Sequence, residues 1–327
     1  PASASSSRGK KKPKKKKKKT GEGDAKPLTG DCFRSDLHAS GALQDVTADA
    51  AAASRFDAAV GTALSDQSTV VFGLAYQAGS GMLTSFTMTA TQTQQSATSR
   101  VFGIGVSFHG SDSDSDSDSE AAPDFFVPTM DLRSVDGAAA RQAAAFGHVR
   151  DLVESSSVLV SWELQTLFRH LSSWFSDLRP DSLFDPKIAI WLRHSDTKQD
   201  LTFHDAAAHS LKESKQWQDY EERYKSARPT DAEGPGPSLS SQLSAFAADL
   251  RLVRQLAVRM FERVNDPEVG EEQVCLAQCL PCEMSTAALL GRMEAAGLPV
   301  DVELLRSPVP ALQETLYALE AQAHALA

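Results

Sequence analysis

Two short apolar runs constrain the fold of this chain more than any other feature. The first reads Val-Val-Phe-Gly-Leu-Ala-Tyr over residues 70–76, and the second covers residues 101–108. Each run is bounded by polar residues and is short for a helix, so both are predicted to be buried strands. A third run, at residues 125–127, follows a hydrophilic insertion. The second and third runs are therefore expected to pair in antiparallel fashion across an expanded loop.

Helical spacing replaces the strand pattern further along the chain. A strand is predicted at residues 158–162, and apolar residues then recur at helical intervals from Leu164 to Leu178. Asp185-Pro186 predicts another helix start, because the Asp side chain accepts backbone N–H bonds there and a proline in the first position costs no hydrogen bond. The buried face of that helix is expected to comprise Ile188, Ala189, Trp191 and Leu192.

The C-terminal third also has helical spacing. Apolar residues at alternating intervals of three and four form one narrow ridge over residues 243–260. Gly297 predicts the end of a further helix, and a last helix is expected around Leu312 and Leu319. Strands with a hairpin, followed by helices around another strand, indicate an α/β protein in which helices flank a mixed sheet.

Charge is distributed unevenly along the 327 residues. Residues 1–19 contain ten basic groups and no acidic group, whereas the rest of the chain has 23 basic against 43 acidic residues. The acidic body should repel phosphate backbones unless its basic residues gather in one groove. DNA affinity is therefore expected to come from the basic tail or from sequence beyond Ala327.

The basic tail is predicted to be disordered and, with the linker after it, to cover residues 1–64. Its lysines resemble a nuclear localisation signal, which predicts a nuclear protein. Two alternatives remain open: the tail could bind nucleic acid through counterion release, or it could be a solvated segment without a specific partner. The lysines concerned are Lys10, Lys11, Lys12, Lys14, Lys15, Lys16, Lys17, Lys18 and Lys19.

Three further features bear on the class of protein. No stretch approaches the roughly 18 to 20 apolar residues of a membrane helix, and no secretory signal is present, so an intracellular protein without a membrane partner is expected. The start at Pro1 and the stop at Ala327 within a helical pattern indicate a fragment. The cluster Cys275, Cys279 and Cys282 has the spacing of an iron–sulfur motif, but buried or half-buried thiols at a helix junction are the favoured interpretation.

Two segments resemble family A DNA polymerases of the theta and nu kind. Residues 182–192, Ser-Leu-Phe-Asp-Pro-Lys-Ile-Ala-Ile-Trp-Leu, with Leu-Thr-Phe-His-Asp at 201–205, are similar to a stretch of their exonuclease-like domain. Residues 281–301, with Leu-Glu-Ala-Gln-Ala-His at 319–324, are similar to the beginning of their polymerase domain.

The resemblance implies a domain organisation. It predicts a ribonuclease H-like domain at residues 65–265, a linker at 266–281 and the first helices of a polymerase domain at 282–327. The parent protein would be a DNA-directed DNA polymerase of replication or repair, which contacts DNA mainly through the missing part of that domain. The missing part would also hold Mg²⁺, and no cofactor is expected in the fragment.

The same resemblance implies that the exonuclease site is inactive. Active relatives hold two metal ions with an Asp-x-Glu on the first strand, an Asp after a second motif and an Asp on a later helix. Here Gly73 and Ala75 occupy the first two positions. The Asp of the second motif is absent, although Glu163 lies close by in sequence. Asp249 alone is in register, and its default interpretation is an acid on the surface of a helix.

Three hypotheses follow from these patterns. The leading one is a polymerase fragment whose exonuclease-like domain is an inactive scaffold without a metal site. The second is an active metal-dependent 3′-5′ exonuclease that uses Glu163, Asp185 and Asp249 as unusual ligands. The third is a nuclear interaction protein without catalytic activity.

Overall fold

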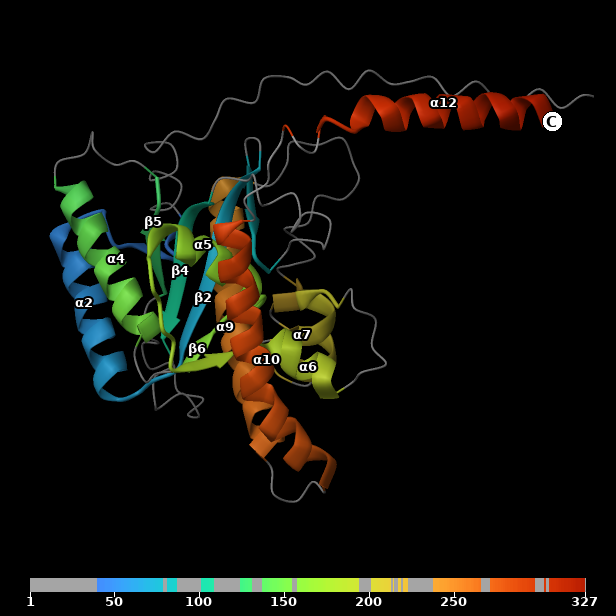
Figure 1. The fold of residues 1–327 in the computed structure, drawn as a ribbon. Coiled ribbons are helices and arrows are strands. Elements are labelled where there is room, and N and C mark those ends of the chain that lie inside the picture. Colours follow the sequence, from blue (N-terminus) through green and yellow to red (C-terminus); the bar gives the residue numbers. More distant parts are fainter. Residues whose placement is uncertain are drawn as a thin grey trace, which may run out of the picture.

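A computed structural model gives the fold shown in Figure 1. Its central element is one mixed sheet, and helices pack on both faces. The chain is described over residues 40–78, 81–86, 101–108, 124–130, 137–154, 158–193, 201–212, 214, 217–218, 220–222, 238–265, 271–297, 303 and 306–326.

Seven strands make up the sheet in the described parts of the chain. Their order across the sheet is β1-β5-β4-β2-β6-β7, and β3 pairs with the end of β2. Strand β2 therefore lies at the centre, between an antiparallel neighbour, β4, and a parallel one, β6. The strands are β1 (Gln44–Asp45), β2 (Val70–Ala78), β3 (Gly81–Thr84), β4 (Val101–Phe108), β5 (Phe125–Pro128), β6 (Val158–Val160) and β7 (Ser182–Phe184).

The strand predictions from the apolar runs are confirmed. Strands β2, β4 and β5 form where the three runs lie, and β4 pairs with β5 in antiparallel fashion as expected. The hydrophilic insertion between β4 and β5 lies outside the described residues. The coarse prediction of a mixed sheet covered by helices is also confirmed.

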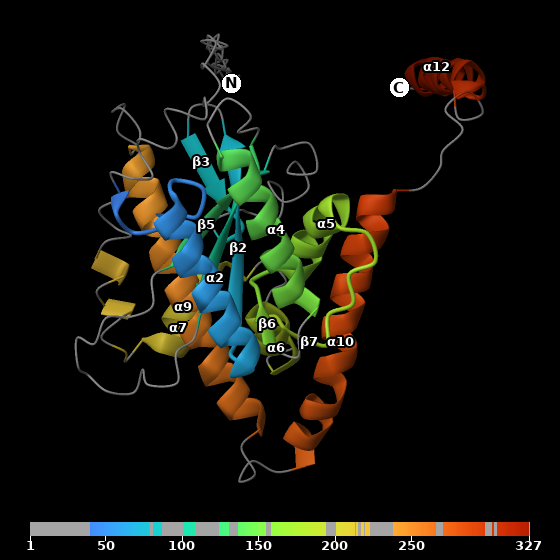
Figure 2. The ribbon, with the colours of Figure 1, turned by 90° about the vertical axis from the view of Figure 1, so that its left-hand side faces the viewer.

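The helices form two layers around the sheet. Helices α2 and α4 lie side by side on one face, and α9 crosses the other face (Figure 2). Helix α10 packs mainly against α5 at one end of the sheet. The helices are α2 (Ala50–Ser65), α4 (Ala138–Glu154), α5 (Leu164–Trp174), α6 (Pro186–Arg193), α7 (Phe203–Leu211), α9 (Leu239–Asn265), α10 (Glu271–Ala296) and α12 (Val309–Leu326).

The folded part begins earlier than residue 65, where the sequence analysis placed the end of the tail and linker. Helix α2 starts after Asp49, whose side chain accepts a hydrogen bond from the Ala52 backbone N–H. Phe56 and Val60 are four residues apart and both are buried. An N-cap and an apolar ridge therefore stabilise a helix in an alanine-rich segment, because alanine favours the helical state.

The helix start at Asp185-Pro186 is confirmed, but its buried face differs from the prediction. The Asp185 carboxylate accepts a hydrogen bond from the Lys187 backbone N–H, and Pro186 is the first residue of α6. Of the predicted residues, Ala189 is buried, Ile188 and Leu192 are partly buried against the core, and Trp191 is 43% exposed. Pro186 and Ile190 are buried as well. Because α6 has only two turns, the residues that it buries depend on how it is rotated against the neighbouring helices, which the spacing within α6 does not specify.

The two C-terminal helices differ in burial. Helix α10 passes without a break through the predicted boundary at residue 281, and Gly297 ends it with a φ of +68°. Gly291 faces the α5 backbone so closely that a Cβ atom would meet the Gln165 carbonyl oxygen. Residues 309–324 of α12 are exposed throughout. Within the described ranges, no helix has the length and apolar character needed to span a membrane.

Candidate functional site

The candidate site is the face of the central strands that lies under α9. Gly73 of β2 is paired directly with Gly105 of β4, and Ala75 is paired with Gly103. Side chains alternate between the two faces of a strand, so Gly73 and Ala75 lie on the same face. These four small residues leave a shallow depression at the centre of the sheet.

Aromatic side chains fill this depression. A Cβ atom built on Gly73 would lie 2.7 Å from ring atoms of Phe86 and 2.9 Å from a ring atom of Phe246. A Cβ atom on Gly105 would meet Leu250 and Phe246 at 2.7 and 2.8 Å. Real Cβ atoms do not approach other carbons this closely, so the glycines are required for this packing.

The rings over the small residues form one contiguous group, called here the aromatic cluster. Phe86 lies 5.4 Å from Phe203 and 5.8 Å from Phe246, measured between ring centroids. Phe246 also meets Phe126 edge-on at 6.5 Å. Trp162 extends the group through Phe203, at 5.3 Å. The rings of Phe86 and Phe246 thus take the space into which a carboxylate side chain at position 73 would have to project.

Asp249 lies one turn of α9 beyond Phe246, and it is not the surface acid expected from the sequence. Its side chain is buried, and its Oδ1 atom accepts a hydrogen bond of 2.7 Å from the Tyr220 hydroxyl. Burial raises the pKa of Asp249 to about 7, against the smaller opposing effect of the Tyr220 hydrogen bond. Asp249 therefore serves as a buried hydrogen-bond acceptor between α9 and the segment that carries Tyr220.

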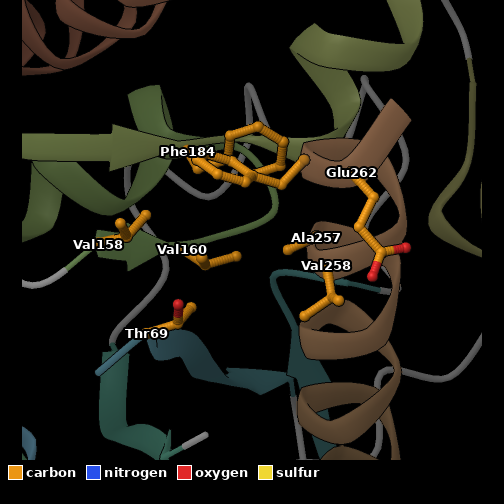
Figure 3. Close-up of a pocket in the computed structure, with 8 residues that line it drawn as sticks. Thr69, Val158, Val160, Phe184, Ala257, Val258 and Glu262 are labelled. Carbon is orange, nitrogen blue, oxygen red and sulfur yellow. The ribbon is translucent and has the colours of Figure 1, made fainter. Parts of the chain in front are cut away.

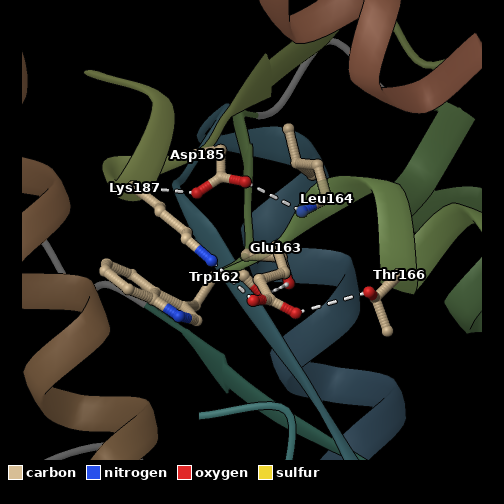
Figure 4. Close-up of polar contacts among 7 residues, drawn as sticks. Trp162, Glu163, Leu164, Thr166, Asp185 and Lys187 are labelled. Carbon is tan, nitrogen blue, oxygen red and sulfur yellow. Dashed lines mark hydrogen bonds and ion pairs between the residues drawn. The ribbon is translucent and has the colours of Figure 1, made fainter. Parts of the chain in front are cut away.

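Glu163 follows β6 and is engaged by a lysine. Its Oε1 atom lies 2.7 Å from Lys187 Nζ, and its Oε2 atom accepts a long hydrogen bond of 3.4 Å from the Thr166 hydroxyl (Figure 4). The Lys187 ammonium also lies 5.9 Å from the centre of the Trp162 ring. The ion pair neutralises the negative charge that a metal ligand would need.

Asp185 is buried and connects two helix starts. Its Oδ2 atom accepts a hydrogen bond from the Leu164 backbone N–H at 2.9 Å, and Oδ1 accepts one from the Lys187 backbone N–H at 2.9 Å (Figure 4). Burial raises the pKa of Asp185 to about 6, while these two hydrogen bonds and the Lys187 charge oppose the shift. Its two carboxylate oxygens thus hold the first turns of α5 and α6 together.

The three carboxylates of the nuclease hypothesis consequently have different partners. Asp249 is bonded to Tyr220, Glu163 to Lys187, and Asp185 to two backbone N–H groups. Across the described ranges, no group of three His, Cys, Asp or Glu side chains is close enough to hold a metal ion. A pair of Mg²⁺ ions needs several oxygen ligands around one point, which these residues do not fit.

The cysteine prediction is wrong for the two thiols whose side chains are described. Cys279 and Cys282 are free and exposed on α10, because Leu280, Met284 and Ala287 form the face that packs on the body. The side chain of Cys275 and the tail lysines at 10–12 and 14–19 lie outside the described residues.

Several residues of this site were not found from the sequence. Phe86, Phe203 and Tyr220 come from short segments without strong periodicity, so nothing marked them as core. The sequence contained one indication of this packing, the two glycines Gly103 and Gly105. Two glycines in alternate positions of an apolar strand, with a third in the neighbouring strand, indicate that a bulky group approaches one face closely.

Comparison with known proteins gives little guidance. No protein-family profile and no curated protein matches the chain. A solved structure described as "Structure of yeast NOT1 MIF4G domain co-crystallized with CAF1" is 9% identical, with a TM-score of 0.36. The match covers 65% of this chain and 87% of that one.

These findings overturn the interpretation of the chain as part of a family A DNA polymerase. No family profile and no curated protein of a DNA polymerase or an exonuclease matches the chain. The residues that carried the resemblance have local structural roles instead. Asp185 and Pro186 start α6, Gly291 allows α10 to approach α5, and Gly297 ends α10. Helix starts, close contacts and helix ends need such residues in any protein.

Proposed function

We propose that the folded body from β1 at residue 44 to the end of α9 at residue 265 is a ribonuclease H-like domain that has no metal-dependent catalysis and serves as a scaffold for interactions. One observation carries the proposal: the aromatic cluster fills the face of the central strand on which a two-metal site would need its first carboxylates. The rings of Phe86 and Phe246 would have to be displaced before Gly73 could be replaced by a metal ligand.

The arrangement of the strands supports the ribonuclease H-like part of the proposal. In that fold, metal ligands come from the first long strand, from a segment after a later strand and from a late helix. The corresponding segments here are β2, the end of β6 with Glu163, and α9. All three meet at the middle of the sheet, since β6 is the parallel neighbour of β2 and α9 packs on β2.

A scaffold role also agrees with the charge of the body. Beyond residue 19 the chain has 23 basic and 43 acidic residues, so its folded part gains little from phosphate neutralisation. We further propose that the basic tail directs the protein to the nucleus, because nine lysines within ten positions, 10–19, match the composition of a localisation signal.

A nuclease assay tests the proposal against the hypothesis of an active site with unusual ligands. The purified chain is incubated with a 3′-labelled and a 5′-labelled single strand in the presence of Mg²⁺ or Mn²⁺. We expect no metal-dependent shortening, because Glu163, Asp185 and Asp249 are held by other partners. The control variant is Asp205→Ala, which removes an exposed acid. The proposal is overturned if the strand is shortened from its 3′ end and this activity is lost in Asp249→Ala but kept in Asp205→Ala.

A further inference from the structure

A cavity lies beside the C-terminal half of α9, away from the aromatic cluster. Its volume is about 170 Å³. Figure 3 shows its walls: Val158 and Val160 of β6 and Phe184 at the end of β7 face residues of α9. The eight lining residues are Thr69, Val158, Val160, Phe184, Ala257, Val258, Phe261 and Glu262.

The cavity exists because side chains on both of its sides are small. Ala257 occupies the position on α9 that follows Phe246, Leu250 and Val253 along the buried ridge. The valines of β6 do not extend far enough to meet a methyl group across the gap. Phe261 leans over the edge, 5.7 Å from the Phe184 ring between centroids, and remains 50% exposed.

The size and lining define the shape of a suitable ligand. An enclosed apolar cavity of about 150 Å³ holds a single benzene-sized molecule, and this pocket, which opens to solvent beside Phe261, has a similar volume. Six of the eight lining side chains are hydrocarbon, and two of them are aromatic. One ring therefore fits this space, with Phe184 and Phe261 available for edge or stacked contacts.

The polar lining residues define the charge of the ligand. Thr69 supplies a hydroxyl group and Glu262 a carboxylate, and the lining includes no Lys, Arg or His. Figure 3 places the Glu262 carboxylate next to Val258 along the helix, at the side of the cavity. A cationic group on the ligand would lie close to this carboxylate, whereas an anionic group would be repelled by it.

We infer that this cavity is a binding site for a small aromatic amine, in which the ring enters between β6 and α9 and the ammonium group pairs with Glu262. The site does not depend on the proposed scaffold function, because none of its residues belongs to the aromatic cluster or to the three carboxylates. It adds a ligand-binding role to the same helix.

Three probes of one ring size test the inference: benzylamine, benzyl alcohol and benzoate, which differ in charge. Dissociation constants are measured by ligand-observed NMR titration of the whole chain. We expect benzylamine to bind tightest and benzoate weakest. In Glu262→Gln, the affinity for benzylamine should fall about threefold to fivefold, as for an exposed ion pair, while that for benzyl alcohol stays constant.

Two variants fill the cavity and serve as controls. Ala257→Leu should abolish binding of all three probes, and the smaller change Ala257→Val should weaken it, so the test survives if the first variant fails to fold. Circular dichroism checks the fold of each variant. The inference is overturned if benzylamine does not bind at millimolar concentration, if the filled variants bind it equally well, or if benzoate binds as tightly as benzylamine.

Discussion

Helix α9 meets the sheet in two different ways along its length. In its first half, the Phe246 ring lies over the paired glycines Gly73 and Gly105, so a large side chain on the helix matches missing side chains on the strands. In its second half, Ala257 faces the β6 valines, and a cavity of about 170 Å³ remains.

The two halves of α9 show that small residues in an interface can have two opposite effects on packing. Small residues on one side of an interface are compatible with tight packing when the other side is large, as over Gly73. Small residues on both sides leave room for a ligand, as beside Ala257. The face of the central strand at Gly73 is thus part of the core, and the pocket beside Ala257 lies further along the same helix.

Two phenylalanines of α9 provide the largest contrast between these regions. Phe246→Ala should lower the free energy of unfolding by about 3–5 kcal/mol, because a fully buried ring is removed and a cavity remains. Phe261→Ala should cost less than about 1 kcal/mol, since that ring is half exposed and borders existing space.

Urea unfolding of both variants measures the contrast. The slope of the unfolding free energy against urea concentration should be the same for wild type and both variants. Equal slopes show that the three proteins expose the same amount of surface on unfolding. Similar losses for Phe246→Ala and Phe261→Ala would mean that the aromatic cluster is not more tightly packed than the cavity region. The comparison between the two halves of α9 would then be wrong.

The buried carboxyl of Asp249 predicts a pH dependence of stability. Its pKa is about 7 in the folded protein and about 4 when unfolded, so the folded state keeps the proton longer. The stability from this group is fully present below about pH 4 and is lost as the pH rises to 7 and above. Asp249→Asn removes the ionisation, so its stability relative to wild type should increase by on the order of 3 kcal/mol from pH 4 to pH 8.

Thermal or urea unfolding of wild type and Asp249→Asn over this pH range gives the difference directly. The difference cancels the contributions of other groups, such as Asp185, whose pKa is also raised, and His170, whose pKa is lowered to about 4. Tyr220→Phe removes the hydrogen bond that opposes the shift and should extend the loss of stability to higher pH. A relative stability that does not change with pH would show that Asp249 ionises as in solution.

The sequence predicted elements whose side-chain pattern is regular. The runs at 70–76 and 101–108 form strands because all positions except Ser107 are apolar and both faces of the sheet are covered by helices. Residues 243–260 form a helix with the expected ridge. All six apolar residues of that ridge are buried: Leu243, Phe246, Leu250, Val253, Ala257 and Met260. In these cases local pattern and tertiary burial agree, so either one is enough to identify the element.

The sequence did not predict features that depend on distant partners. Asp249 is buried because Tyr220, 29 residues earlier in the chain, supplies its hydrogen bond. Cys279 and Cys282 are exposed because α5 receives the opposite face of α10. The role of Gly73 becomes clear only with Phe86 and Phe246 in place. In each case the decisive contact comes from a separate element, which spacing within one segment cannot specify.

Two glycine-to-alanine substitutions have the smallest expected effect on stability, and they test directly how tightly the rings pack over the central strand. The Cβ atom of Gly73→Ala would lie 2.7 Å from Phe86 and 2.9 Å from Phe246, so rings or strands must shift, at a cost of about 1–3 kcal/mol. Gly61 is exposed in α2 with no atom near its Cβ position, and Gly61→Ala should stabilise the protein by about 0.5–1 kcal/mol. The same added methyl group should therefore have opposite effects at the two positions when unfolding by urea is measured.

If Gly73→Ala is as stable as wild type, the rings can move aside at little cost. A carboxylate could then be accommodated on the central strand, and the aromatic cluster would no longer explain why this sheet should lack a two-metal site.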